Sequence, residues 1–291
     1  MALVYFDKFK EVTGGGNFGD DINPALMGKF IRRSILTSED VALFGVGTIL
    51  NDKNILGSRH YPRKVVFTSG VGYGPLDSTF DDSWDIACVR GPRSAKKLGL
   101  GADRAIADGA ILLSQMYEKP SDINKRPLFI PHVNSHLSTG SVLAAIADKL
   151  NMDYISPGAE ASEFISKVAR APFVVTEAMH GAILADTMRV PWIPVGLHEH
   201  FDFKWRDWME SVGLDKGNVF QLSPKCWDPK LRSEGASPIR SIYRKGKEHF
   251  LLRAIRNLVR DESPLLSATG VLEEKKAALL KVAEHINDNY G

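Results

Sequence analysis

The sequence predicts an α/β protein built from two doubly wound, Rossmann-like units with parallel sheets that face a cleft, followed by a helical tail. Short apolar runs alternate with segments of helical period along most of the chain, and short glycine-bearing loops join them. The same rhythm restarts after a polar, proline-bracketed stretch. We therefore expect one domain at 1–118, a linker at 119–127, a second domain at 128–230 and the tail at 231–291.

In the first half, apolar runs rich in β-branched and aromatic residues predict the strands. These strands are expected at 2–6, at 41–47, at 64–72, and at the start of 85–101, where the chain turns at Gly91-Pro92 into a short helix. A further helix is expected at 23–33, and the segment 104–113 closes this half.

In the second half, the same criteria predict strands at 127–134, 153–158, 172–181 and 191–197. The helices between them are expected at 140–151, 160–171 and 181–190. The tail is expected to hold a basic helix at 241–262 and a last helix at roughly 271–288. Ligands of parallel sheets bind beyond the carboxyl ends of the strands, so a clefted enzyme is a plausible product of this architecture.

The composition is that of an ordinary globular protein, with 44% hydrophobic and 25% charged residues. A net charge of +2 gives no general affinity for polyanions, so a nucleic-acid partner is not expected. Cys88 and Cys226 form no metal-type spacing and no disulfide framework, which favours a reducing cytoplasm. Because neither a signal peptide nor a long apolar run is visible, we expect a soluble protein that at most lies against a membrane.

The stretch "GGGNFGDDIN" at 14–23 resembles a phosphate cradle but ends in two aspartates. It matches neither the dinucleotide nor the Walker pattern. Its bare backbone allows a ligand or a neighbouring segment to approach closely, which makes Gly16, Asn17 and Gly19 candidate binding residues. Asp20, or Asp21 beside it, either caps the next helix or binds a ligand, and capping is the commoner role at such turns.

The stretch "CVRGPRSA" at 88–95 places Arg90 at a strand end and Ser94 in the first turn of a helix. An arginine there could grip a carboxylate or phosphate through two parallel hydrogen bonds, with help from the helix N-terminus. The alternative is a surface arginine that pairs with Asp85 or with the sheet edge.

The stretch "VVTEAMHGAILAD" at 174–186 places His180 and Gly181 where a buried strand gives way to a helix. Histidine is suited to give or take a proton near neutral pH, although many histidines at such junctions are structural. Glu177 on the same strand could orient His180 or pair elsewhere. His132 lies at another strand end and has the same two interpretations.

The stretch "HEHFDFKWRDW" at 198–208 gathers histidines, Lys204 and Arg206 among aromatic residues. No cysteine or acidic ligand completes a recognised metal spacing for His198 and His200, so we predict no metal site. Aromatic and charged groups together fit a wall on which a sugar stacks, and the alternative is a surface loop with buried anchors.

The motifs "GNFGDDIN", "VRGPRS", "TEAMHGAILAD", "VPWIPV" and "FDFK" occur in this order through about residue 210. Taken together they resemble the polysaccharide pyruvyl transferase family, in particular its bacterial exopolysaccharide members of succinoglycan-type pathways. The resemblance implies a GT-B-like fold and a transferase that moves a pyruvyl group from phosphoenolpyruvate to two hydroxyls of one sugar. The product would be a cyclic ketal in an exopolysaccharide or its lipid-linked precursor, with release of phosphate.

The resemblance also implies roles for individual residues. The donor-binding arginine and lysine fall on Arg90 and Lys204, and the catalytic histidine falls on His180, which would protonate the donor. No metal or organic cofactor is needed in principle. Many relatives carry arginine where this chain has Ala178, and we expect Arg93, Arg206 or the glycine loop to take over its donor contacts.

Two other functions fit the same sequence. One is a GT-B glycosyltransferase that uses a nucleotide sugar, and the other is a non-catalytic glycan-binding subunit of an assembly complex. The basic tail could rest on an anionic inner membrane that holds a lipid-linked acceptor, or it could pack on the body with a solvated basic face. Its basic residues are Arg244, Lys245, Lys247, Arg253, Arg256 and Arg260.

Overall fold

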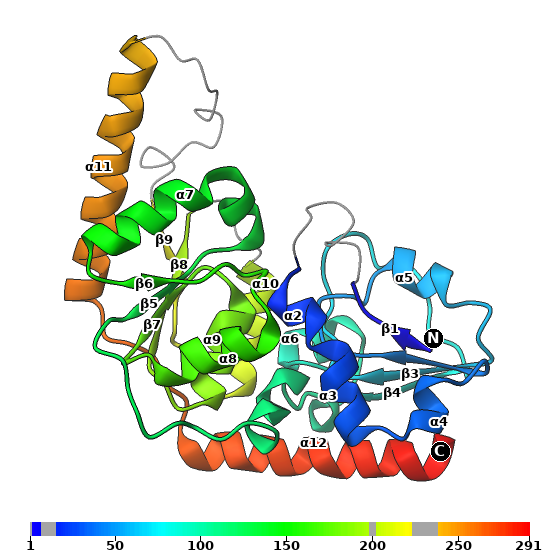
Figure 1. Ribbon diagram of the computed structural model, residues 1–291. Helices are drawn as coiled ribbons and strands as arrows, with labels where there is room; N and C mark the ends of the chain where they lie inside the picture. The colour runs from blue at the N-terminus through cyan, green and yellow to red at the C-terminus, as the bar shows by residue number, and fades with distance from the viewer. Residues whose placement is uncertain (1, 7–15, 198–201, 223–237) are drawn as a thin grey trace.

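The computed structural model describes residues 2–6, 16–197, 202–222 and 238–291, without the side chains of 238–244. Two parallel sheets lie in separate units side by side, with helices packed around them (Figure 1). The α/β class predicted from the alternating apolar runs is confirmed. The strands of the two sheets fall at 3–88 and 128–221, while the exact domain boundaries stay a prediction.

The first sheet has four parallel strands in the order β1-β2-β3-β4. They are β1 (Leu3–Val4), β2 (Val41–Phe44), β3 (Arg63–Phe67) and β4 (Trp84–Cys88). The helices of this unit are α2 (Phe18–Asp21), α3 (Asn23–Phe30), α4 (Arg33–Leu36), α5 (Asp52–Gly57) and α6 (Pro92–Lys97), followed by the 3₁₀ helices η1 (Ala102–Arg104) and η2 (Gly109–Gln115). Because each strand is added beside the previous one, this sheet has no reversal of order and departs from the doubly wound arrangement that we expected.

The second sheet has five parallel strands in the order β6-β5-β7-β8-β9. They are β5 (Leu128–Ile130), β6 (Asp153–Tyr154), β7 (Val174–Thr176), β8 (Trp192–Gly196) and β9 (Phe220–Gln221). The helices are α7 (Val133–Lys149), α8 (Ala161–Arg170), α9 (Met179–Thr187) and α10 (Asp202–Ser211). The strand order reverses between β5 and β7, and ligands of open α/β sheets bind at such a switch point.

The α10 helix was not predicted, because both interpretations of its aromatic residues, a wall on which a sugar stacks and a surface loop with buried anchors, left it without a helix. Trp205 and Trp208 are three residues apart and therefore lie on one helical face, where both are buried. Their rings lie 6.4 and 5.3 Å from that of the buried Trp192 of β8. Trp205 and Trp208 are therefore buried anchors, as the second interpretation predicts, and a helix allows both to face the core from one side.

The two units share a hydrophobic core. One cluster of buried apolar side chains contains residues from the first unit, the second unit and the tail. Phe18 of α2 stacks on Phe164 of α8, with ring centroids 4.2 Å apart, and this contact joins the two units directly.

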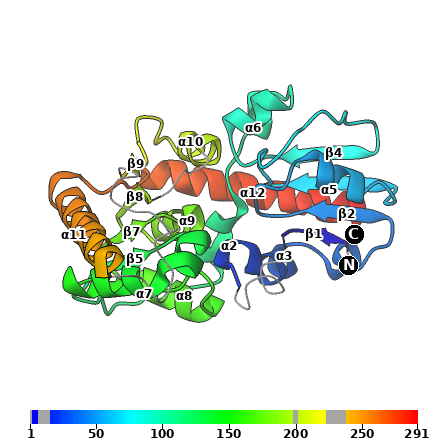
Figure 2. The ribbon, with the colours of Figure 1, turned by 90° about the horizontal axis from the view of Figure 1, so that it is seen from above.

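The tail has two helices, α11 (Pro238–Asp261) and α12 (Thr269–Tyr290). α11 packs on the second unit through Leu251, Ile255 and Leu258. α12 runs along both units and ends beside the first (Figures 1 and 2). There, the Asn287 side chain donates to the Phe30 carbonyl at 2.8 Å, and the Tyr290 hydroxyl donates to Asp85 at 3.1 Å. α12 therefore ties the two units together.

Candidate active site

A pocket of about 390 Å³ lies between the two units, at the switch point of the second sheet. The first unit contributes α2, the loop after β2, α5 and Tyr73. The second unit contributes the starts of α7 and α9, together with Lys204 of α10. A pocket of this size is within the usual range for small-molecule sites, and its position agrees with where open α/β sheets bind ligands.

His180 lies in the first turn of α9 and lines this pocket with its side chain 15% exposed. Its Nε2 atom is 3.7 Å from Oδ2 of Asp108, whose side chain is fully buried. Neither atom has a hydrogen-bond partner among the described residues. Asp108 Oδ1 accepts from the Ala110 N–H at 3.0 Å and so caps η2, which fixes the carboxylate beside the imidazole. A carboxylate that faces a histidine in this way can orient the ring.

Asp108 is a residue that the sequence reasoning missed. It lies in "RAIADGAILL", a stretch assigned only to closing the first half. The available signal was an aspartate immediately before a glycine and an apolar run, which is a typical N-cap. The N-cap pattern gives no sign that a histidine of the other unit lies beside Asp108. Asp108 and His180 come together because η2 packs against α9.

The position of Gly19 shows why the glycine-rich stretch has a glycine there. A Cβ atom at this position would lie 2.6 Å from Cε1 of His180 and closer still to Nδ1. Only glycine therefore leaves the imidazole where it is. The predicted close approach to Gly19 is made by the histidine ring. Gly16 is likewise closely approached, by Asp21 and by Gly158.

Asp20 does not cap the following helix, so the capping interpretation is wrong. Asp20 and Asp21 both lie inside α2, and α3 begins after Ile22 with no side-chain cap. Asp20 lines the pocket, where the Asn17 amide donates to its carboxylate at 2.5 Å. Burial raises the pKa of Asp20 to about 6, although the nearby His180 acts to lower it. Asn17 also lines the pocket.

Lys204 reaches the pocket from α10 and donates to the Tyr73 hydroxyl of the first unit at 2.6 Å. Lys53, on α5, lines the pocket as a second lysine. The starts of α7 and α9 open into the same space, and the first turn of α9 has no side-chain cap. Free N–H groups at a helix start favour anions, so cations and helix starts converge here.

Arg90 is fully buried and does not line the pocket. Its Nε donates to Asp207 of α10 at 3.0 Å, and one of its terminal nitrogens donates to the Thr48 hydroxyl at 2.7 Å. Thr48 lines the pocket, so Arg90 lies directly behind the pocket wall. Ser94 is buried in the same network and donates to Asp207 at 2.6 Å. Asp207, and not Asp85, is thus the partner of Arg90.

Glu177 pairs away from His180. It is buried and accepts the N–H groups of His132 at 2.9 Å and Leu197 at 3.1 Å. Glu177 thereby ties together the segments that follow β5 and β8. A Cβ at Gly181 would lie 2.7 Å from the Thr176 hydroxyl, so this glycine allows α9 to pack closely on the sheet.

The arginines expected to replace the one missing at Ala178 are paired elsewhere. Arg93 donates to Glu210 with two nitrogens, and Arg206 donates to Asp202 at 2.9 Å. Ala178 itself lines the pocket, where Lys53 and Lys204 supply positive charge.

His198 and His200 lie outside the described residues. Within the described part of the chain, no three His, Cys, Asp or Glu residues are grouped to hold a metal ion.

Comparisons with known proteins agree with the motifs. The profile of the polysaccharide pyruvyl transferase family matches residues 12–199. The chain is 38% identical over 203 residues to the succinoglycan biosynthesis protein ExoV of Rhizobium meliloti (strain 1021), and this alignment covers 68% of the chain but only 62% of that protein. A mutant O-GlcNAc transferase of Thermobaculum terrenum matches at 11% identity and a TM-score of 0.30, over 85% of this chain and 49% of that one, a likeness too low to support the fold. The match over residues 12–199 contains the glycine loop, Arg90 and His180, and the chain belongs to the polysaccharide pyruvyl transferase family.

Proposed function

We propose that this protein is a transferase that moves a pyruvyl group from phosphoenolpyruvate to two hydroxyls of one sugar in an exopolysaccharide or its lipid-linked precursor. The observation that carries the proposal is the position of His180 in the interdomain pocket, held between Gly19 and Asp108. Lys204 and the uncapped start of α9 share that pocket. Phosphoenolpyruvate carries a carboxylate and a phosphate, and this set of groups matches two anionic ends.

In the proposed reaction, protonated His180 gives its proton to the methylene carbon of phosphoenolpyruvate. The adjacent carbon then becomes electrophilic and forms a bond to the first sugar hydroxyl, whose proton returns to the imidazole. The second hydroxyl displaces phosphate from the same carbon and closes the ketal ring, and its proton leaves with the phosphate. General acid catalysis of this kind contributes about 10²–10⁴-fold to rate. Asp108 orients the imidazole throughout.

The two substrates would occupy different sides of the pocket. A carboxylate is a poor neighbour for phosphate but accepts hydroxyl protons well, so Asp20 is assigned to the sugar. Lys204, Lys53 and the α9 start are assigned to the donor. His180 and Asp20 line the same pocket, so His180 would act beside both substrates. Phosphoenolpyruvate is a cytoplasmic metabolite, so we place the reaction in the cytoplasm.

The test uses purified protein, phosphoenolpyruvate and the glycan isolated from a strain that lacks the gene. We expect phosphate release that requires both substrates, and a pyruvate ketal on the glycan by mass spectrometry. His180→Ala should abolish turnover, whereas His60→Ala, at an exposed position of the first unit, should not change it. Incorporation from a nucleotide sugar alone would indicate a glycosyltransferase. Glycan binding without any turnover would indicate a non-catalytic subunit.

We further propose that α11 holds the protein at an anionic membrane surface where a lipid-linked acceptor is found. Exposed basic residues lie three or four positions apart and form a single stripe, beside Phe250 at 60% exposure. The stripe consists of Lys245, His249, Arg253, Arg256 and Arg260. Lys247 is buried and does not belong to it, and the Arg244 side chain lies outside the described residues. None of the described helices is long and apolar enough to cross a bilayer.

Liposome co-sedimentation tests this contact. Each basic residue near an anionic surface contributes about 1 kcal/mol, so Arg253→Glu combined with Arg256→Glu should weaken partitioning at least tenfold. Vesicles that contain phosphatidylglycerol should bind the wild type, and pure phosphatidylcholine vesicles should not. Equal binding to both kinds of vesicle, or unchanged binding of the double variant, would contradict the proposal.

A further inference from the structure

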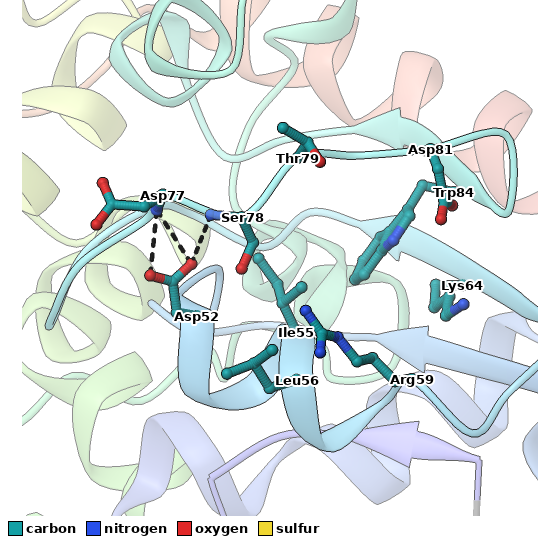
Figure 3. A pocket seen from close by; sticks show the side chains of 10 residues that line it. All are labelled: Asp52, Ile55, Leu56, Arg59, Lys64, Asp77, Ser78, Thr79, Asp81 and Trp84. Atoms are coloured by element: carbon teal, nitrogen blue, oxygen red, sulfur yellow. Dashed lines mark hydrogen bonds between the residues drawn. The ribbon is translucent and has the colours of Figure 1, made fainter.

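A second pocket lies on the first unit, on the other side of α5 from the candidate active site. Its volume is about 710 Å³. Figure 3 shows side chains from α5 and from the segment between Asp77 and Trp84 arranged around it. No role for this pocket follows from the motifs or from the proposed chemistry at His180.

The lining combines apolar and polar groups in a way that suits a sugar. Trp84 is partly exposed, and Ile55 and Leu56 of α5 border the same space, with Leu56 45% exposed. Arg59 and Asp77 are exposed at its edge and can donate and accept hydrogen bonds. A sugar ring has apolar C–H faces and a polar rim of hydroxyls, so it requires both kinds of surface.

The same two segments border both pockets. Asn51, Lys53 and Asn54 of the α5 region line the active-site pocket, and the next residues of that helix line the second one. The loop that begins at Tyr73 in the active-site pocket reaches the second pocket by Asp77. An α-helix with its side chains is about 10–12 Å across, which sets the scale of the separation. A chain of several sugars can span this distance.

The wall between the pockets is fixed by Asp52. Its carboxylate accepts the N–H groups of Asp77 at 3.0 Å and Ser78 at 2.8 Å, as drawn in Figure 3. The Ser78 hydroxyl, together with these two N–H groups, lowers the pKa of the Asp52 carboxyl and so favours its charged form. The Asp52 N–H also donates to the Pro75 carbonyl at 3.0 Å. The two pockets therefore have a constant spacing.

We propose that the second pocket binds non-reacting sugars of the acceptor glycan while the active-site pocket holds the sugar that receives the pyruvyl group. The inference rests on the proposed function. A ring lies against Trp84 and Leu56, and Arg59 and Asp77 bind its hydroxyls. Binding energy from remote parts of a substrate helps to position the reacting part, so a polymeric acceptor gains more from this pocket than a monosaccharide.

The test is isothermal titration calorimetry without phosphoenolpyruvate. The ligand is a set of oligosaccharide fragments of the glycan isolated from a strain lacking the gene. Arg59→Ala and Leu56→Ser change exposed side chains and should leave the melting temperature unchanged, yet each should raise the Kd of the longer fragments at least tenfold. Arg33→Ala, at an exposed arginine of α4, is the matched control and should leave the Kd unchanged. Trp84→Ala should have the largest effect, with folding checked separately because Trp84 packs on Phe44.

Steady-state turnover separates this inference from the proposed function. Arg59→Ala should raise the KM for the glycan about tenfold and leave the KM for phosphoenolpyruvate unchanged. An unchanged Kd and KM in all three variants, or no fragment binding to the wild type, would overturn the second pocket and leave the pyruvyl transfer intact. Binding of glycan fragments that depends on Trp84, without any phosphate release, would contradict the proposed pyruvyl transfer and support the sugar-binding role of the second pocket.

Discussion

Replacement of Gly19 by alanine tests the arrangement around His180 with the addition of a single methyl group. Gly19 lies in α2 and its backbone does not adopt a left-handed conformation, so alanine is acceptable to the backbone and favoured by helix propensity. Any loss of activity must therefore come from the new Cβ atom and not from a strained main chain.

The size of the effect follows from the geometry. The Cβ would lie 2.6 Å from Cε1 of His180 and nearer still to Nδ1, whereas non-bonded carbon atoms rest about 3.5–4.0 Å apart. The imidazole must therefore move by about 1 Å or more, away from its position beside Asp108. A displacement of about 1 Å at a reacting group can cost about 10²-fold in rate, so we expect kcat to fall by at least that factor.

The assay is phosphate release with phosphoenolpyruvate and the isolated glycan, together with a thermal melt of each protein. Gly28→Ala is the matched control, because Gly28 is an exposed residue of α3 and a Cβ there would meet nothing within 4 Å. It should keep full activity and gain up to about 1 kcal/mol of stability. A folded Gly19→Ala protein with a kcat near that of the wild type would refute the reasoning, because His180 would then not need its observed position.

Three further substitutions test the surroundings of the site. In Asp20, burial raises the pKa from 3.8 to about 6, so the folded protein holds this proton more tightly than the unfolded chain and loses stability as the pH rises from about 4 to 6. Asp20→Asn should therefore increase the free energy of unfolding at pH 7 by up to about 3 kcal/mol and flatten this pH dependence, as measured by urea unfolding. Asp207→Ala leaves the buried Arg90 charge unpaired and should cost about 3–5 kcal/mol in the same measurement. Lys204→Met removes a charged donor and should raise the KM for phosphoenolpyruvate about 10–100-fold with a small effect on folding.

Much of the fold could be predicted because most strands lie in short apolar runs, whereas β9 (Phe220–Gln221) has no such run and was not predicted. The residues of β2, β7 and β8 are buried throughout, as the uninterrupted runs "VALF", "VVT" and "WIPVG" indicate. Strand order was not predictable in the same way, because no local pattern states which edge of a sheet receives the next strand. The α5 helix was also missed, since its six residues are too short to show helical periodicity.

Sequence patterns single out residues that have chemical meaning alone, and they give no sign of residues that two units bring together. A histidine at a strand-to-helix junction stands out by itself, and the structure places His180 in the pocket. Tyr73 and Lys53 reach the pocket, and Asp108 reaches His180, only through packing between segments far apart in the chain, and a single sequence gives no signal of such contacts. For Asp20 the sequence favours capping over ligand binding only if the helix begins after it, and in the structure α2 already contains Asp20.

The motif around Arg90 lies beside the pocket, as the sequence suggests, but Arg90 does not face the ligand space itself. Arg90 and Ser94 both bind Asp207, and Gly91 is needed because a Cβ there would collide with the Asp207 carbonyl. These three contacts fix α10 against α6, and Lys204 lies one turn earlier on the same helix. The motif therefore sets the position of a cation that lines the pocket, besides holding Thr48 in its wall. A buried arginine in this position would support donor binding without touching the donor, because the residues that it holds are the ones that face the ligand.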